Sequence, residues 1–162
     1  MVCTINEFAT TWRSESSITS RVLGALTDPS LEQRVTARDR SLGDIAWHLA
    51  TAIPEMAAGT GLVIPGGDHR APAPTSARKI RDAYDEAAAA LLAAVVESWT
   101  DTALQLEDMM YGESWKRGLT LSVLIVHEIH HRGQMTVLMR QAGLSVPSIY
   151  GPNREETEAM RG

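Results

Sequence analysis

Residues 119–142, with the sequence LTLSVLIVHEIHHRGQMTVLMRQA, decide the fold of this chain. The stretch contains no proline, and apolar residues fill most of it. An apolar run of this length predicts a helix that is buried in the protein interior. Gly143 suits the left-handed residue that ends many helices, and Pro147 follows soon after, so the helix is predicted to end near residue 142. Three of the chain's five histidines lie within it.

The histidines of this helix are spaced so that two of them can converge on one ion. On a helical wheel His131 lies about 40° from His127, and His130 lies about 60° from His127 on the other side. Spacings of three and four residues both bring two side chains together, as a metal site requires. A buried, hydrogen-bonded histidine is the ordinary alternative for a single residue, but two on one helical face favour a metal. The wheel leaves both pairs open: His127 with His131, and His127 with His130.

The charged residues of the same helix lie on the side away from His127. They are Glu128, Arg132 and Arg140. Glu128 and Arg132 are four residues apart, which is the spacing of a salt bridge on an exposed helix face. We therefore expect this side of the helix to face solvent.

Amphipathic patterns elsewhere predict three further helices and no strands. The connections between the helices are predicted to be irregular, over residues 28–40, 58–74 and 100–118. Because no alternation of period two occurs, less than about 5% of the residues are expected in strands. The three helices are predicted over residues 4–27, over residues 41–54, where Pro54 ends or kinks the helix, and over residues 75–99.

Two of these helices begin with the spacing of a capping box, in which two side chains satisfy free backbone amides. Thr4 lies three residues before Glu7, and Ser41 lies three residues before Asp44. His48 falls on the apolar face of the second helix. Asp44 lies four residues before His48, so it could hold the imidazole ring instead, but capping the helix is its favoured role.

The composition is that of a single globular domain covering residues 1–162. Hydrophobic residues make up 44% of the chain and charged residues 22%. A formal net charge of −5 gives no support for binding nucleic acid through its phosphates. No segment approaches the roughly 18 consecutive apolar residues of a membrane span, and the first residues lack the pattern of a signal peptide, so a cytoplasmic protein is expected. Cys3 is the only cysteine, which excludes an internal disulfide and a cysteine-based zinc site.

Four amphipathic helices predict an all-α four-helix bundle. Such bundles place metal sites in the core, between side chains of facing helices. His48 and two histidines of residues 119–142 could supply three neutral nitrogen ligands and leave one position open, as in catalytic metal sites. A metal held in this way lowers the pKa of bound water to about 7, and it favours the thiolate form of a bound thiol.

The residues from His127 to His131 also match the H-E-x-x-H pattern of zinc proteases, in which the glutamate is the general base. The extended form of that motif has glycine where this chain has Gln134. No strand is predicted that could hold a peptide substrate. The protease interpretation is therefore disfavoured. Its third ligand would have to come from the C-terminal tail, from Glu155, Glu156 or Glu158.

Four segments of the chain form a more specific pattern: SLGDIAWHL at 41–49, HEIHHRGQM at 127–135, LMRQAG at 138–143, and Pro147 to Gly151. By the order and spacing of these segments the chain resembles the DinB/YfiT-like family of metal-binding four-helix bundles. The histidine-arginine-glycine-glutamine run at 131–134 is the most specific part. The similarity extends over nearly the whole chain.

This resemblance implies a bundle with long crossover connections and a homodimer. It also implies that His48, His127 and His131 bind a divalent metal ion, and that His130 is not a ligand. Zinc is the expected metal. Nickel, iron and manganese are alternatives, because imidazole ligands discriminate poorly among these ions.

The resemblance further implies a class of reaction. Members of the family include S-transferases and isomerases that use low-molecular-weight thiols such as bacillithiol or mycothiol. The expected partners are therefore a small thiol and an electrophilic substrate. Two alternatives remain: a hydrolase in which Glu128 is the base for a metal-activated water, and a non-enzymatic binding or stress-response protein in which the metal holds helices together.

Overall fold

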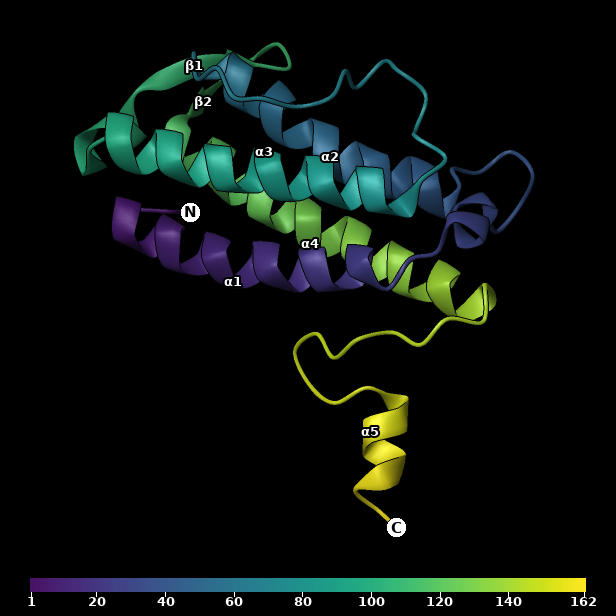
Figure 1. The fold of residues 1–162 in the computed structure, drawn as a ribbon. Coiled ribbons are helices and arrows are strands. Elements are labelled where there is room, and N and C mark those ends of the chain that lie inside the picture. Colours follow the sequence, from purple (N-terminus) through teal and green to yellow (C-terminus); the bar gives the residue numbers. More distant parts are fainter.

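Four long helices form the body of the protein, which is described here over residues 1–162 by a computed structural model. They lie side by side as a bundle (Figure 1). The predicted all-α bundle is confirmed, and each predicted helix overlaps one of the four. The helices are α1 (Ile5–Gly24), α2 (Leu42–Gly59), α3 (Ala77–Ser98) and α4 (Arg117–Gln141).

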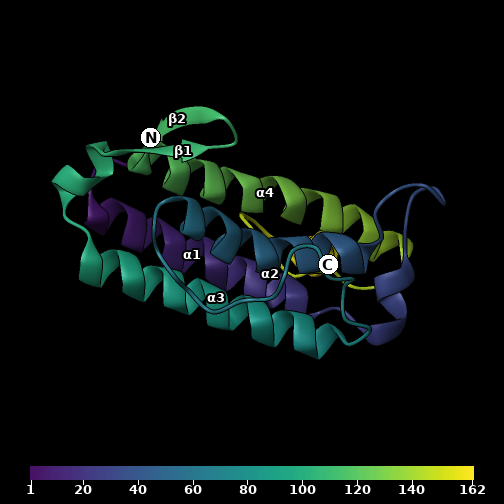
Figure 2. The same ribbon diagram turned by 90° about the horizontal axis from the view of Figure 1, so that it is seen from above.

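Each helix packs against two others, and the order around the bundle differs from the order along the chain. α3 packs against α1 and α2, and α4 packs against α2 and α1. The connection from α1 to α2 and the connection from α3 to α4 therefore cross the bundle. α2 and α3 run in the same direction, so residues 60–76 return along the length of the bundle (Figures 1 and 2).

The predicted helix caps form, one completely and one in part. The hydroxyl of Ser41 accepts a hydrogen bond from the amide of Asp44 at 3.1 Å, and the carboxylate of Asp44 accepts one from the amide of Ser41 at 2.9 Å. At α1 the hydroxyl of Thr4 accepts from the amide of Glu7. The carboxylate of Glu7 binds the amide of Cys3 rather than that of Thr4, so this box is only half formed.

Pro54 was predicted to end or kink its helix, and the first of these alternatives is wrong, because α2 continues past Pro54 to Gly59. The returning loop packs closely on the same helix. A Cβ atom on Gly66 would lie 2.4 Å from Cγ of Pro54, and one on Gly67 would lie 2.3 Å from Cη2 of Trp47. These two glycines let the loop backbone approach the outer surface of α2.

The prediction that residues 100–118 are irregular is wrong in part. They contain a short 3-10 helix, Asp101–Gln105, and a hairpin of β1 (Glu107–Met110) and β2 (Glu113–Lys116). Tyr111 and Gly112 form the turn with φ of 53° and 87°, the left-handed pair that two-residue hairpins favour. The strands contain four residues each and lack apolar alternation, so no pattern in the sequence predicted them. The hairpin lies beside the start of α4 (Figure 2).

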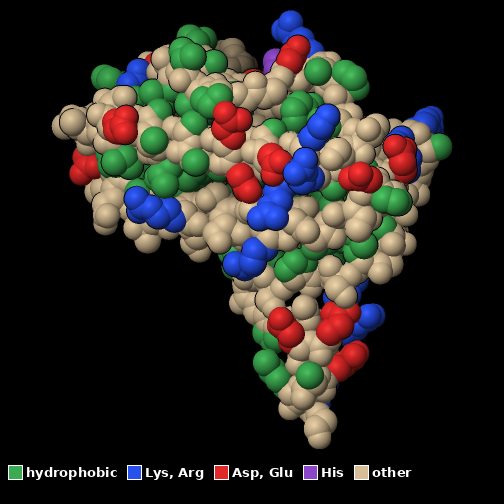
Figure 3. All heavy atoms as spheres, in the orientation of Figure 1, with side chains coloured by type: hydrophobic (Ala, Val, Ile, Leu, Met, Phe, Trp, Pro, Cys, Tyr) green, Lys and Arg blue, Asp and Glu red, His purple; other side chains and the backbone are tan.

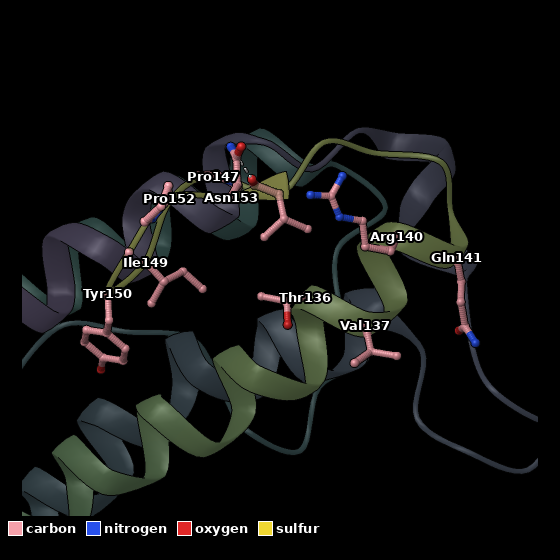
Figure 4. Close-up of a pocket in the computed structure, with 11 residues that line it drawn as sticks. Thr136, Val137, Arg140, Gln141, Pro147, Ile149, Tyr150, Pro152 and Asn153 are labelled. Atoms are coloured by element: carbon pink, nitrogen blue, oxygen red, sulfur yellow. Dashed lines mark hydrogen bonds between the residues drawn. The ribbon is translucent and has the colours of Figure 1, made fainter. Parts of the chain in front are cut away.

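The C-terminal segment leaves the bundle after α4 and ends in a short helix, α5 (Arg154–Ala159), which projects away from the body (Figures 1 and 3). A hollow of about 670 Å³ lies between the last turns of α4 and residues 146–153 (Figure 4), and none of the histidines lines it. Acidic and basic side chains are interspersed over the face of the bundle shown in Figure 3. No helix has both the length and the apolar character that crossing a membrane requires.

Candidate metal centre

Three histidines from two helices converge between α2 and α4. Nε2 of His127 lies 2.9 Å from Nε2 of His48 and 3.1 Å from Nε2 of His131. The three candidate ligand atoms all lie within 4.8 Å of one another. α4 brings His127 and His131 together because they are one turn apart, and the packing of α2 against α4 adds His48.

The donor set fits a divalent metal. In a tetrahedral site with bonds of about 2.1 Å, two nitrogen ligands are about 3.4 Å apart, and the two separations from Nε2 of His127, 2.9 and 3.1 Å, are somewhat shorter. Nδ1 of His131 lies 2.7 Å from Oε1 of Gln134. Since an amide oxygen only accepts, that nitrogen carries the ring proton, and the lone pair of Nε2 faces the other two rings. Nδ1 of His127 is buried and has no hydrogen-bond partner in the protein.

The environment keeps the three rings neutral. Burial, the neighbouring His131 and the charge of Arg40 lower the pKa of His48 to about 4. Burial, followed by the other histidines and Arg40, lowers the pKa of His127 to about 4 as well. Burial also lowers the pKa of His131, although its hydrogen bond to Gln134 acts in the opposite direction. At neutral pH the lone pairs of all three rings are therefore free to bind a cation.

His130 and Asp44 lie near the cluster but outside it. The ring of His130 is exposed and stacks edge-on against His131, with 4.9 Å between the ring centroids, but the convergent group consists of His48, His127 and His131. Asp44 is occupied in the cap of α2 and forms no hydrogen bond with His48.

The prediction that Glu128 and Arg132 lie on an exposed face is wrong, because both side chains are buried. Both carboxylate oxygens of Glu128 lie 2.8 Å from the hydroxyl of Tyr84 on α3, and Oε2 also accepts a hydrogen bond from Thr19 on α1 at 3.1 Å. Burial raises the pKa of Glu128 to about 7. The carboxylate points toward α1 and α3, whereas the histidines face α2.

Arg132 joins a second set of buried polar groups instead of pairing with Glu128. Its guanidinium donates to the backbone oxygen of Glu15 at 3.1 Å, to the hydroxyl of Thr19 at 3.0 Å, and to the carboxylate of Glu15. It also contacts the hydroxyl of Tyr150, which in turn donates to Glu15 at 2.7 Å. Arg132 thereby ties the C-terminal segment to α1.

A signal for this polar cluster is present in the first helix. Glu15 and Thr19 continue the buried face that begins with Phe8 and Trp12, at spacings of three or four residues. Polar residues at such positions need polar partners from other helices, because an unpaired buried group is costly. Glu128 and Arg132 are those partners on α4.

Two hollows flank the histidines. The larger, of about 620 Å³, is lined by His131, Gln134 and a mainly apolar wall that includes Ile45 and Leu138. The smaller, of about 240 Å³, is lined by His48 together with residues of α2 and of the returning loop. One hollow therefore reaches His131 and the other reaches His48, whereas His127 lines neither.

Comparison with known proteins places these features in a family. A model of the DinB family matches residues 1–161. YrdA of Bacillus subtilis (strain 168), an uncharacterized protein, is 44% identical over 156 residues, which are 96% of this chain and 93% of that protein. The crystal structure of a DinB-like protein from Bacillus cereus has a TM-score of 0.89 at 43% identity, and the match covers 93% of this chain and 100% of that chain. A DinB-like protein from Bacillus subtilis, with a TM-score of 0.69 at 18% identity over 88% of this chain and 97% of its own, shares the fold.

Proposed function

The chain belongs to the DinB family, and we propose that it is a metal-dependent enzyme that transfers a low-molecular-weight thiol to an electrophilic substrate. The observation that carries this proposal is the convergence of three neutral imidazole nitrogens, with one hollow lined by His131 and another lined by His48. Three protein ligands with an open position are typical of catalytic metal sites, whereas structural zinc sites have four.

His48, His127 and His131 would hold the metal, for which zinc is proposed and nickel, iron and manganese are alternatives. When bound, the ion supplies a Lewis acid that favours a thiolate over a thiol at neutral pH. The three imidazoles carry no negative charge and so leave the charge of the cation uncompensated. Gln134 fixes the orientation of the His131 ring through its hydrogen bond to Nδ1.

The proposed reaction needs no nucleophile from the protein. Cys3 is the only cysteine and is exposed, and it does not line either hollow. The thiol loses its proton to solvent, and its sulfur forms a bond to the electrophilic carbon. The bond from that carbon to the leaving group breaks, and the leaving group departs with the electron pair. The two reactants would occupy the hollow lined by His131 and the hollow lined by His48.

The position of Glu128 weakens the hydrolase alternative. A general base must reach the water that it activates, and the Glu128 carboxylate is bonded to Tyr84 and Thr19 on the other side of α4. A non-enzymatic role has more support, because a metal bound by these histidines would also link α2 to α4. That role predicts stabilisation by the metal without turnover.

The test is a thiol-dependent conjugation assay on zinc-loaded protein. Monochlorobimane is offered with each of several low-molecular-weight thiols, and ester and amide substrates are offered separately without thiol. We expect conjugation above the uncatalysed rate that is lost in His48→Ala and retained in His130→Ala, whose ring lies outside the cluster. Ester or amide hydrolysis without thiol would favour the hydrolase. No turnover on any substrate, with a melting temperature that falls sharply on chelation, would favour the non-enzymatic role.

A further inference from the structure

Arg40 is shared by the two hollows that flank the histidines. It lines the larger hollow together with His131 and Gln134, and it lines the smaller one together with His48 and Trp47. It directly precedes Ser41, the residue that caps α2, so the start of that helix fixes its backbone. No other lysine or arginine lines either hollow.

The guanidinium of Arg40 has no hydrogen-bond or salt-bridge partner within the protein, although Asp39 lines the larger hollow with it and Asp44 lines the smaller one. Arg40 is exposed and takes part in none of the salt bridges of the chain, in contrast to Arg34 in the same connection, which pairs with Glu32. The carboxylate of Asp39 accepts a hydrogen bond from the amide of Thr36 at 3.0 Å. Asp44 is likewise occupied by the amide of Ser41. Arg40 therefore presents free donors to both hollows.

Arg40 lies near two of the three candidate ligands, because it shares the lining of one hollow with His131 and the lining of the other with His48. His69 also lines the smaller hollow, 3.9 Å from the carboxylate of Asp68. An anion bound at Arg40 would therefore lie near a metal held by the three rings.

The two hollows differ in the chemistry that they suit. The larger has four apolar residues among its eight lining residues, and its volume of about 620 Å³ falls in the usual range for small-molecule sites. The smaller, at about 240 Å³, lies below that range, and its lining is mixed: Arg40, Asp44, His48, Thr51 and His69 are polar, and Trp47, Ala71, Pro72 and Ala73 are apolar. It would therefore accept one polar end of a ligand. An arginine with free donors at such a place suits a carboxylate, which it binds through paired hydrogen bonds.

We propose that Arg40 binds a carboxylate of the thiol substrate, so that the thiol's anionic end occupies the smaller hollow while its sulfur reaches the three histidines. The electrophile then occupies the larger, apolar hollow. This inference rests on the proposed function and narrows it: the physiological thiol carries a carboxylate a few bonds from its sulfur. Arg40 acts as a specificity-determining residue.

The test compares two thiols that differ only in charge. Binding of 3-mercaptopropionate and of 3-mercaptopropionamide to zinc-loaded protein is measured by calorimetry, in the wild type and in Arg40→Met, Arg40→Lys and Arg38→Met. Arg38 is exposed, belongs to the same connection and lines neither hollow, which makes it the matched control. We expect the wild type to prefer the carboxylate by about tenfold or more, as for one hydrogen bond between charged groups. Arg40→Met should remove this preference, Arg40→Lys should keep part of it, and Arg38→Met should keep it fully.

The inference is wrong if the wild type shows no preference, or if Arg40→Met retains the preference of the wild type. It is also wrong if Arg38→Met loses as much as Arg40→Met. A second comparison, of iodoacetate with iodoacetamide as electrophile, identifies the source of the carboxylate. If Arg40→Met alters only the use of iodoacetate, the anion belongs to the electrophile and the assignment to the thiol fails. Because calorimetry needs no turnover, a carboxylate preference without conjugation would refute the proposed function and leave the anion site standing.

Discussion

His127 holds the central position of the cluster, because its Nε2 faces the Nε2 atoms of both His48 and His131. Alanine at any of these three positions is expected to remove bound metal, since two imidazoles hold a divalent ion much more weakly than three. His130→Ala is the matched control on the same helix and should keep the metal. Metal content per chain after dialysis measures the outcome. Metal lost in His130→Ala and kept in His131→Ala would overturn the assignment.

Glu128 makes the stability of the folded chain depend on pH. Tyr84, Thr19 and Arg132 favour its charged form and Glu15 opposes it, but burial is the largest effect and raises its pKa to about 7. The unfolded chain releases this proton near the ordinary pKa of about 4.3. Below that pH the carboxyl group is protonated in both states and its burial costs little. The free energy of unfolding then falls as the pH rises from about 4.3 to about 7.

Glu128→Gln removes this dependence because the amide stays neutral. The free energy of unfolding of the variant minus that of the wild type should rise by about 3 kcal/mol as the pH rises from 4.5 to 8. Denaturant unfolding of both proteins across this range provides the measurement. A difference between wild type and variant that stays constant with pH would show that the buried carboxylate does not titrate there.

At the level of single residues, the helical wheel predicted part of the site. It placed His127 and His131 on one face but left His130 open, because a wheel of one helix does not contain the position of α2. The resemblance to the family favoured His131 over His130 as the second ligand of this helix. The burial of Glu128 and Arg132 was missed because their partners lie on other helices and at Tyr150, far away in sequence.

Among the elements, the start of α4 is constrained by the N-terminus of the chain. A Cβ atom on Gly118 would lie 2.5 Å from the backbone oxygen of Val2, and the amide of Val2 donates to Ser122 at 2.7 Å. Gly118→Ala must therefore displace a bonded backbone segment, and a loss of about 1 to 3 kcal/mol in unfolding free energy is expected. Gly151→Ala, with nothing within 4 Å of the added atom, is the control and should change stability by less than about 0.5 kcal/mol. Equal effects of the two substitutions would contradict this packing.

The long helices were predictable from their apolar periodicity, and α1 and α2 also from a start signal, as at Ser41. Their ends were less so: α2 runs through Pro54 because packing against α3 and α4 outweighs the loss of one backbone hydrogen bond. The hairpin was not predictable. Its turn residues, Tyr111 and Gly112, are not the usual asparagine and glycine, and its strands gain their stability from contacts with α2 and α4.

On the scale of the whole molecule, α4 exposes an apolar stripe. Val126 is 63% exposed, Val137 is 56% exposed, and Ile129 lies between them on the same face. The homodimer implied by the family resemblance stays a prediction, and this stripe is where we expect the second copy to pack. Val126→Glu should weaken the dimer, because a carboxylate would be buried without a partner. Val96→Glu, on the exposed side of α3, is the control and should not.

Light scattering of the eluting protein at tens of micromolar measures the mass of each variant. A monomeric wild type at that concentration would count against the dimer. A dimeric wild type that Val126→Glu leaves intact would place the interface elsewhere.

Because the buried polar cluster joins α4 to α1 and α3, the bundle cannot close before α4 has been synthesised. α4 is the last helix of the bundle to leave the ribosome, and it carries Arg132 and Glu128. Until then Glu15 on α1 lacks its cation and Tyr84 on α3 lacks its acceptor. Burying a carboxylate without a counter-charge costs several kcal/mol, so the three helices made first cannot close around this face. A chain that stops at residue 116 is expected to bind the dye ANS strongly, and a compact fragment that ignores the dye would contradict this. The nascent protein thus stays exposed to chaperones and proteases until its final helix supplies an arginine.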